Sequence, residues 1–426
     1  MVVGSPALAS WELNMEILYD CVCGLDVHKS NLTACVVRRQ RSGAVQRETR
    51  TFSTMGAGIL ALASWLEGWG ATHVALESSG VYWKPVFNLL EDRFTVVLVN
   101  AQHVKRVPGR KTDVGDAEWL AELQFHGLLT PSFIPPRAQR DLRDLTRLRS
   151  QLINEQCRVV NRIQKVLEDT GCKLSAVASN VLGVSGRAMI EALLAGQTDP
   201  ASLAELARGR LREKLPALRE ALCCLVRDHH RFLLRLLLDQ LDEYQAHLEA
   251  LSQQIDAALA AAAPVLDRLT EIPGVDRKVA QVLAAEIGLD MAQFPTPEQL
   301  CSWAGLCPGN DESAGKRRSG RISPGNRWLK TTLVQAAWAA SHTKDTYLSA
   351  QYQRLAKRRG KKRALVAVAH TILETAYWML KRGTHYAELG ADWFDHRAPQ
   401  RLARYYLGRL EELGVKVTVE PEATVA

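Results

Sequence analysis

Long uncharged apolar segments are missing from this sequence, since none reaches about 18 residues, the length that suggests a membrane-spanning helix. The amino terminus also lacks the basic segment and apolar core that mark a signal peptide. Neither sign of charge dominates: 54 Lys and Arg residues stand against 46 Asp and Glu, so the net charge of +8 favours an anionic partner only slightly. We therefore expect a cytoplasmic protein that does not contact a membrane.

The cysteines show no disulfide framework. There are nine, an odd number, and their spacing has no regular pattern. Cys301 and Cys307 lack the close Cys or His partners that a tetrahedral zinc site needs. The sequence predicts free thiols in a reducing compartment.

What is present is enough apolar sequence, 47% of 426 residues, for a folded chain of two or three domains. Composition and pattern change at several points along the chain. The expected segments are an N-terminal extension at 1–20, an α/β domain at 21–136, a helical region at 137–262, a C-terminal helical domain at 263–385 and a tail at 386–426.

The α/β domain begins with a short apolar run that ends on a carboxylate. Residues 21–26 read as a strand closing on Asp26, and residues 31–38 alternate as a second strand. A later buried run, 72–77, closes on Glu77, and a helix at 114–125 begins between Asp113 and Asp116. Three strands followed by alternating helices and strands is the order of a ribonuclease-H-like mixed sheet.

Carboxylates gathered by such a sheet can hold two divalent cations, which can clamp the attacking and leaving oxygens of a phosphodiester. Asp113 and Asp116 share one helical face, although acidic residues in a first helical turn also occur simply because they stabilise the helix dipole. The stretch before this helix favours a phosphate backbone close by. Its basic residues are Lys105, Arg106, Arg110 and Lys111.

Two long tracts, 137–166 and 203–262, have apolar residues at helical spacing. We expect them to pair as an antiparallel coiled coil or as a contact between copies of the chain. Periodicity alone allows an intramolecular bundle equally well. An interruption is expected at Pro216, and residues 173–202 show no pattern that places them.

The C-terminal domain opens with Ile272-Pro273-Gly274-Val275, which resembles a helix-hairpin-helix turn. Backbone amides at such a turn, with Gly274 at its centre, suit a phosphate. A plain helical turn is the alternative.

A glycine-punctuated segment then presents Ser313 next to six basic residues and no acid between Lys316 and Lys330. We expect a loop in which a serine attacking phosphorus has cations nearby, although most loop serines are not nucleophiles. The basic residues of this segment are Lys316, Arg317, Arg318, Arg321, Arg327 and Lys330.

A second basic run, 354–363, has seven cations and no acid; such a run is often a solvated face, but here it favours contact with nucleic acid. Six of its cations are the predicted contacts: Lys357, Arg358, Arg359, Lys361, Lys362 and Arg363.

Taken in order, several short motifs resemble one family, the insertion-sequence transposases with a RuvC-like DEDD domain and a C-terminal serine transposase domain. This family includes bridge-RNA-guided recombinases and Piv-type DNA invertases. The motifs that give the resemblance lie at residues 24–29, 77–82, 111–117, 272–275, 312–316 and 325–329.

The resemblance implies that Asp26, Glu77, Asp113 and Asp116 bind magnesium, and that Ser313 is the nucleophile that forms a phosphoserine link to DNA. It also implies a homo-oligomer, dimer or tetramer, in which the carboxylates of one copy meet the serine of another. A structured guide RNA would specify the DNA partners. Pro324 stands where relatives often have a basic residue, and this departure weakens the case for a phosphate contact there.

Two other functions stay open. One is a hydrolytic nuclease of the junction-resolvase kind, in which metal-activated water attacks and Ser313 is incidental. The other is an inactive scaffold that only binds nucleic acid.

Overall fold

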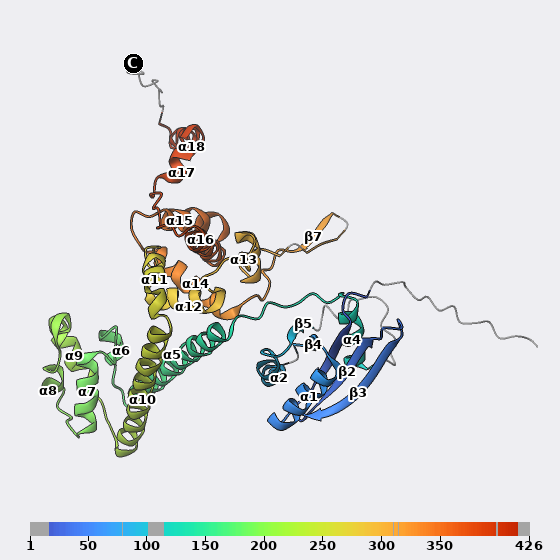
Figure 1. The fold of residues 1–426 in the computed structure, drawn as a ribbon. Helices are drawn as coiled ribbons and strands as arrows, with labels where there is room; N and C mark the ends of the chain where they lie inside the picture. The colour runs from blue at the N-terminus through green and yellow to red at the C-terminus, as the bar shows by residue number, and fades with distance from the viewer. Residues whose placement is uncertain are drawn as a thin grey trace, which may run out of the picture. The chain divides into compact units, whose positions relative to one another are not determined.

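The computed structural model describes residues 17–78, 80–100, 115–309, 311–313, 315–397 and 399–415. The chain forms two compact units, Met1–Ile134 and Pro135–Ala426. The first unit is built on a five-stranded sheet, and the second contains many helices and one small hairpin (Figure 1). Within the described residues, no helix combines the length and apolarity that crossing a membrane requires.

The sheet of the first unit has the strand order β3-β2-β1-β4-β5. The strands β1 (Cys21–Val27), β2 (Asn31–Arg39) and β3 (Val45–Ser53) form an antiparallel meander. On the other side of β1, the strands β4 (His73–Glu77) and β5 (Thr95–Val99) run parallel to it. The prediction of a mixed sheet is therefore confirmed.

Helices cover both faces of this sheet. Alternation along β1 places Cys23 and Leu25 in a core with α1 (Gly56–Trp69) and α2 (Trp83–Leu90). Val22 instead packs against α4 (Asp116–Phe125) on the opposite face. Helix α4 therefore covers the face of the sheet opposite the one that α1 and α2 cover.

Residues 17–20, which the sequence assigns to an N-terminal extension, lie against the core of this unit. Ile17 and Tyr19 pack on the core beneath α4, and the N–H of Leu18 donates to the carbonyl of Phe125 at 3.1 Å. The Tyr19 ring lies 4.1 Å from that of His73. Apolar side chains at 17 and 19 explain this docking, whereas the earlier residues lie outside the described part.

In the second unit, the long helices α5 (Arg137–Asp169) and α10 (Asp228–Ala258) pack against each other. Hydrogen bonds join Gln156 to Gln245 at 3.3 Å and Asp169 to His230 at 3.0 Å, so the two helices run antiparallel. Their pairing lies within one chain, which is the alternative that periodicity left open. Coiled-coil geometry and any contact between copies stay predictions.

Several small helices connect α5 to α10 along the chain. They form a subdomain with its own core, which we call the tip subdomain. They are α6 (Leu174–Val177), α7 (Val184–Leu194), α8 (Pro200–Ala204), η1 (Gly209–Lys214) and α9 (Leu215–Ala221). Pro216 does not interrupt a helix as expected, because it stands in the first turn of α9, where a missing N–H costs nothing. The tract breaks instead at residues 205–208 and 222–227.

The C-terminal body packs six helices around one apolar core, to which α5 and α10 also contribute. The six helices are α11 (Ala263–Leu269), α12 (Arg277–Ile287), α13 (Pro297–Trp303), α14 (Arg327–Ala340), α15 (Tyr347–Arg359) and α16 (Lys361–Arg382). The short α13 leads into a hairpin of β6 (Asp311–Ser313) and β7 (Lys316–Ser319). The single-turn η2 (Ala260–Ala262) precedes α11.

The expected C-terminal tail has structure in its first part. Helices α17 (Trp393–Arg397) and α18 (Pro399–Glu412) follow α16. The ring of Phe394 stacks on that of Tyr347 at 5.1 Å, and Glu388 accepts a hydrogen bond from the Tyr347 N–H at 2.7 Å. Aromatic contacts therefore dock residues after 385 onto the body.

Candidate active site and nucleic-acid interface

Two predicted metal ligands lie at the ends of neighbouring parallel strands. In the register of β1 and β4, Gly24 is opposite Ala75 and Leu25 is opposite Leu76. Continuing by one residue places Asp26 beside Glu77. Because side chains alternate along a strand, both carboxylates point to the face covered by α4.

Gly24 brings α4 close to this edge of the sheet. A Cβ atom at Gly24 would lie 2.2 Å from the carbonyl oxygen of Ala117 and 2.4 Å from the amide nitrogen of Ala121. Only glycine allows the helix backbone to approach the strand this closely. The first residue of that helix, Asp116, is thereby held on the same face as Asp26, which lies two residues after Gly24.

The other acidic residues of α4 are engaged away from this edge. Glu118 accepts a hydrogen bond from the hydroxyl of Thr49 at 3.3 Å, and Glu122 contacts Arg47 and His126. Asp116, at the very start of the helix, is exposed. Of the three acidic residues on α4, Asp116 is the one whose place in the sequence, at the start of the helix, suits it to join Asp26 and Glu77. We call the sheet edge that carries these residues the carboxylate edge.

Asp26 contacts a histidine from its own hairpin. Its Oδ2 lies 3.2 Å from Nε2 of His28, and its side chain keeps 30% of its surface exposed. A cation reaching Asp26 must compete with this contact, and the exposure leaves room for it. Asp113 lies outside the described residues, as do Lys105, Arg106, Arg110 and Lys111.

Asp26, Glu77 and Asp116 offer carboxylate oxygens, the ligands that Mg²⁺ prefers. In the structure their ligand atoms do not come together within metal-binding range: the close group of possible metal ligands among the described residues is Asp169, His229 and His230. There, Nδ1 of His230 accepts from the N–H of Arg227 at 3.3 Å while Nε2 lies 3.0 Å from Asp169. Both ring nitrogens are already bonded, so this group joins α5 to α10 and offers a poor metal site.

Ser313 lies at the tip of the β6–β7 hairpin, where the sequence predicted a loop. It pairs with Lys316, the last pair before the turn. Gly315, in the turn, has a φ of +74°, which glycine adopts without strain. The loop prediction was wrong in detail because one glycine at the turn lets the flanking residues pair as strands.

Close backbone packing holds the base of this hairpin on the body. A Cβ atom at Gly309 would lie 2.4 Å from the carbonyl oxygen of Arg321, and one at Gly325 would lie 2.4 Å from the amide nitrogen of Gly305. The N–H of Gly309 also donates to the Arg321 carbonyl at 3.1 Å. Glycines that the sequence predicts to lie in a loop therefore allow the close backbone packing that positions the hairpin on the body.

A basic groove of about 1010 Å³ opens beside the hairpin base. Its walls are Leu306, Pro308 and residues 320–322 together with α15 and α16. It brings together four predicted nucleic-acid contacts from two separate basic runs. The cations that line it are Arg321, Arg359, Lys362 and Arg363. His370, which the sequence did not single out, also lines it.

The turn at Gly360 concentrates charge beside this groove. Lys357, Arg358 and Arg359 end α15, where cations suit the helix dipole. The next three cations, 361–363, begin α16, where the dipole disfavours them. Six cations around one turn therefore favour an anion.

Three other predicted contacts are engaged within the body. Nζ of Lys330 donates to the carbonyls of Ser323 and Pro324, at 3.3 and 2.6 Å. The Arg327 guanidinium lies over the Trp328 ring at 4.6 Å. A Cβ atom at Gly274 would lie 2.2 Å from the carbonyl oxygen of Ala336 in α14, so this glycine serves close helix packing.

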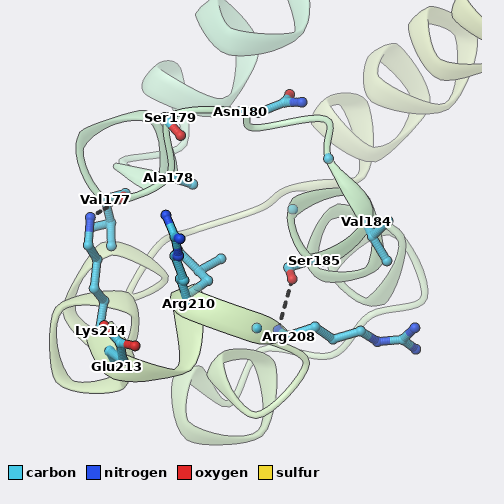
Figure 2. A pocket seen from close by; sticks show the side chains of 14 residues that line it. Val177, Ala178, Ser179, Asn180, Val184, Ser185, Arg208, Arg210, Glu213 and Lys214 are labelled. Atoms are coloured by element: carbon cyan, nitrogen blue, oxygen red, sulfur yellow. Dashed lines mark hydrogen bonds between the residues drawn. The ribbon is translucent and has the colours of Figure 1, made fainter.

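The structure also shows a basic groove in the tip subdomain that the sequence did not predict (Figure 2). It measures about 690 Å³ and lies between η1 and the start of α7. Arg208, Arg210 and Lys214 line it with one acid, Glu213. In Figure 2, the Arg210 side chain extends into the hollow. Alternating cations in the segment 208–214 were the signal that could have revealed it.

Nearby cations outside this groove form ion pairs with acids. Arg212 and Arg219 both pair with Glu205, and Arg187 forms two hydrogen bonds, of 3.0 and 2.8 Å, with Asp242. Among the residues that the structure describes, Arg208 and Arg210 have no ion pair. The groove is thus where this subdomain keeps positive charge available.

Comparison with known proteins gives two matched segments. Residues 23–171 match the DEDD transposase model of the IS110 type, described as "Transposase". Residues 266–353 match the model described as "Transposase IS116/IS110/IS902 family". The first segment contains the carboxylate edge, and the second contains the hairpin with Ser313.

Individual relatives agree with these segments. Over 141 residues the chain is 36% identical to "Insertion element IS110 uncharacterized 43.6 kDa protein" of Streptomyces coelicolor, which covers 32% of this chain and 34% of that protein. It is 26% identical over 327 residues to "Putative transposase y4pF/y4sB" of Sinorhizobium fredii, covering 74% of this chain and 75% of the relative. The match thus spans about a third of the first relative's length. Residues 23–171 and 266–353 of this chain are therefore IS110-family transposase domains.

Proposed function

We propose that this protein is a magnesium-dependent DNA transposase that cuts and rejoins strands through a phosphoserine intermediate at Ser313. The observation that carries the proposal is the placement of Asp26, Glu77 and Asp116 on one face of the sheet. A mixed sheet with carboxylates at adjacent strand ends suits metal-assisted phosphodiester chemistry. The two matched transposase domains support the same reaction class.

Asp26, Glu77, Asp116 and Asp113 would hold the metal, through carboxylate oxygens. Two Mg²⁺ ions bound there would supply electrostatic stabilisation of the charge that develops on the phosphate oxygens. The chain's own part is to fix the donors, which Gly24 does by seating α4 against β1. His28 holds the Asp26 side chain at this edge.

Ser313 would attack the phosphorus of the scissile phosphodiester, and the bond from phosphorus to the leaving sugar oxygen would break. The proton of the serine hydroxyl leaves with the departing alkoxide. The new phosphoserine bond conserves the energy of the broken one, so the reverse attack by a sugar hydroxyl rejoins DNA without ATP. Position at a hairpin tip suits a nucleophile that must reach a bound strand.

The basic groove beside the hairpin would hold the phosphate backbone of the strand to be cut. Its positive charge would attract phosphates but would not distinguish one base from another. The cations that supply this charge are Arg321, Arg359, Lys362 and Arg363. Sequence choice would then come from another partner, and we propose a structured guide RNA. We also propose a homo-oligomer in which the carboxylates of one copy serve the serine of another.

The test is a denaturing gel of the full-length protein with labelled element ends, co-expressed flanking RNA and Mg²⁺. We expect a covalent protein–DNA adduct that disappears in Ser313→Ala, while nucleic-acid binding persists. Asp26→Asn and Glu77→Gln should abolish the adduct as well. Chelation with EDTA should do the same to the wild type and be reversed by added Mg²⁺.

Other outcomes identify the rival functions. Cleavage without an adduct, unchanged in Ser313→Ala, would show a hydrolytic nuclease. Binding with no Mg²⁺-dependent cleavage, with or without the flanking RNA, would show a scaffold. Either outcome contradicts the proposal.

A further inference from the structure

The end of α5 and the segment between α9 and α10 are joined by two backbone hydrogen bonds. The N–H of Leu225 donates to the carbonyl of Thr170 at 2.9 Å, and the N–H of Lys173 donates to the carbonyl of Ala221 at 2.9 Å. Cys172 lies between the bonded positions of the first segment. Two further cysteines, Cys223 and Cys224, lie between those of the second segment.

The thiols of Cys172 and Cys224 interact across this junction, and Cys224 packs against the apolar core to which Cys172 belongs. Cys172 is buried, with 1% of its surface exposed, whereas Cys224 is half-buried and can be reached by a small reagent. Cys223 is exposed. One thiol of the pair is therefore accessible and the other is held behind it.

The two thiols differ in acidity. The interaction with Cys172 lowers the pKa of the Cys224 thiol to about 7. The same interaction, together with burial, raises the pKa of Cys172. An accessible thiol with a lowered pKa beside a buried thiol is the arrangement of an attacking and a resolving cysteine.

We propose that Cys172 and Cys224 form a redox-active dithiol that a low-molecular-weight disulfide converts reversibly into an intramolecular disulfide. The Cys224 thiolate attacks one sulfur of the small disulfide, whose sulfur–sulfur bond breaks and releases one thiolate. Sγ of Cys172 then attacks Sγ of Cys224, expels the second small thiolate and gives up its proton to it. The two cysteines lose two electrons, and the small disulfide becomes two thiols.

The crosslink would close a loop that contains α6 to α9. It would tie the end of α5 to the approach to α10 across the junction that the backbone hydrogen bonds already hold. A disulfide across a long loop restricts the unfolded chain, so the tip subdomain should resist local unfolding better when oxidised. This prediction does not depend on the proposed catalytic function.

The test exposes the full-length protein to glutathione buffers of increasing oxidised fraction, blocks free thiols with iodoacetamide and measures linked peptides by mass spectrometry. We expect a Cys172–Cys224 linked peptide that grows with the oxidised fraction and disappears with dithiothreitol. Limited proteolysis should show slower cleavage in the tip subdomain of the oxidised form.

Three variants control the assignment. Cys223→Ser should leave the link intact, and Cys224→Ser should remove it. Cys172→Ala should stop the reaction at a glutathione adduct on Cys224, a result that also shows a folded protein with a reactive Cys224. Absence of the linked peptide from the wild type, a dominant Cys172–Cys223 link, or a link that survives Cys224→Ser would overturn the proposal.

Discussion

Arg147 and Glu286 form a bidentate ion pair, with both nitrogen-to-oxygen distances at 2.7 Å, although Glu286 is fully buried. Glu286 also accepts a hydrogen bond from Nδ2 of Asn326 at 2.7 Å. The Asn326 side chain in turn caps α14 by accepting from the N–H groups of Trp328 and Leu329. One buried carboxylate therefore joins α5, α12 and the start of the helix that follows the Ser313 hairpin.

Replacing this carboxylate should destabilise the second unit. Glu286→Gln removes the counter-charge that the half-buried Arg147 and the more buried Arg143 share, and breaking such a pair costs up to about 3–5 kcal/mol where both partners are buried. Urea unfolding followed by circular dichroism should measure it. Glu205→Gln is the control, because Glu205 pairs with Arg212 and Arg219 on the surface, where removal costs under about 1 kcal/mol. Equal losses in the two variants would contradict the role assigned to Glu286.

The packing of α4 on β1 predicts a steric effect at Gly24. Gly24→Ala places a Cβ against the backbone of Ala117 and Ala121, so α4 must move. We expect a loss of about 1–3 kcal/mol in unfolding free energy and a larger relative loss of Mg²⁺-dependent cleavage, because Asp116 moves with the helix. Gly68→Ala is the matched control: no atom lies within 4 Å of a Cβ there, and alanine suits a helix interior. Reduced cleavage in Gly68→Ala, or full activity in Gly24→Ala, would count against the placement of Asp116.

The succession of strands and helices in the first unit could be predicted because its signals are local. Asp26 and Glu77 each end an apolar run, but their strands, β1 and β4, become neighbours through a crossover that no local pattern reveals. Local sequence does not show which residue from a distant part of the chain a given residue will contact. Gly274 looked like a phosphate-binding turn, yet its Cα packs on α14, which no spacing near residue 274 reveals. The sequence predicts that Lys330 contacts nucleic acid, but in the structure its ammonium group donates to the carbonyls of Ser323 and Pro324.

That difference between Lys330 and the cations of the hairpin groove gives a third prediction. Arg363→Ala and Lys362→Ala should each weaken nucleic-acid binding and lower the slope of log affinity against log salt by about 1. Lys330→Ala should change the slope less, because its ammonium already bonds two backbone carbonyls. Fluorescence anisotropy at several salt concentrations measures both quantities. Equal slopes for Lys330→Ala and Arg363→Ala would show that the groove is not where phosphate binds.

The groove of the tip subdomain gives the last prediction. Arg210 lines it without an ion pair among the described residues, and Lys214 contributes a second cation whose Nζ donates to the Val177 carbonyl at 3.2 Å. If a phosphate backbone lies there, Arg210→Glu should weaken nucleic-acid binding by about tenfold, because it removes a contact and adds repulsion. Arg235→Glu makes the same change of charge at an exposed position of α10 that does not line the groove, so its effect should be confined to the weaker long-range field. The affinities of the Arg210→Glu and Arg235→Glu variants for DNA and for RNA should be measured at one salt concentration. A larger loss in Arg210→Glu would show a local contact in the groove. Equal losses in the two variants would mean that the groove holds no phosphate.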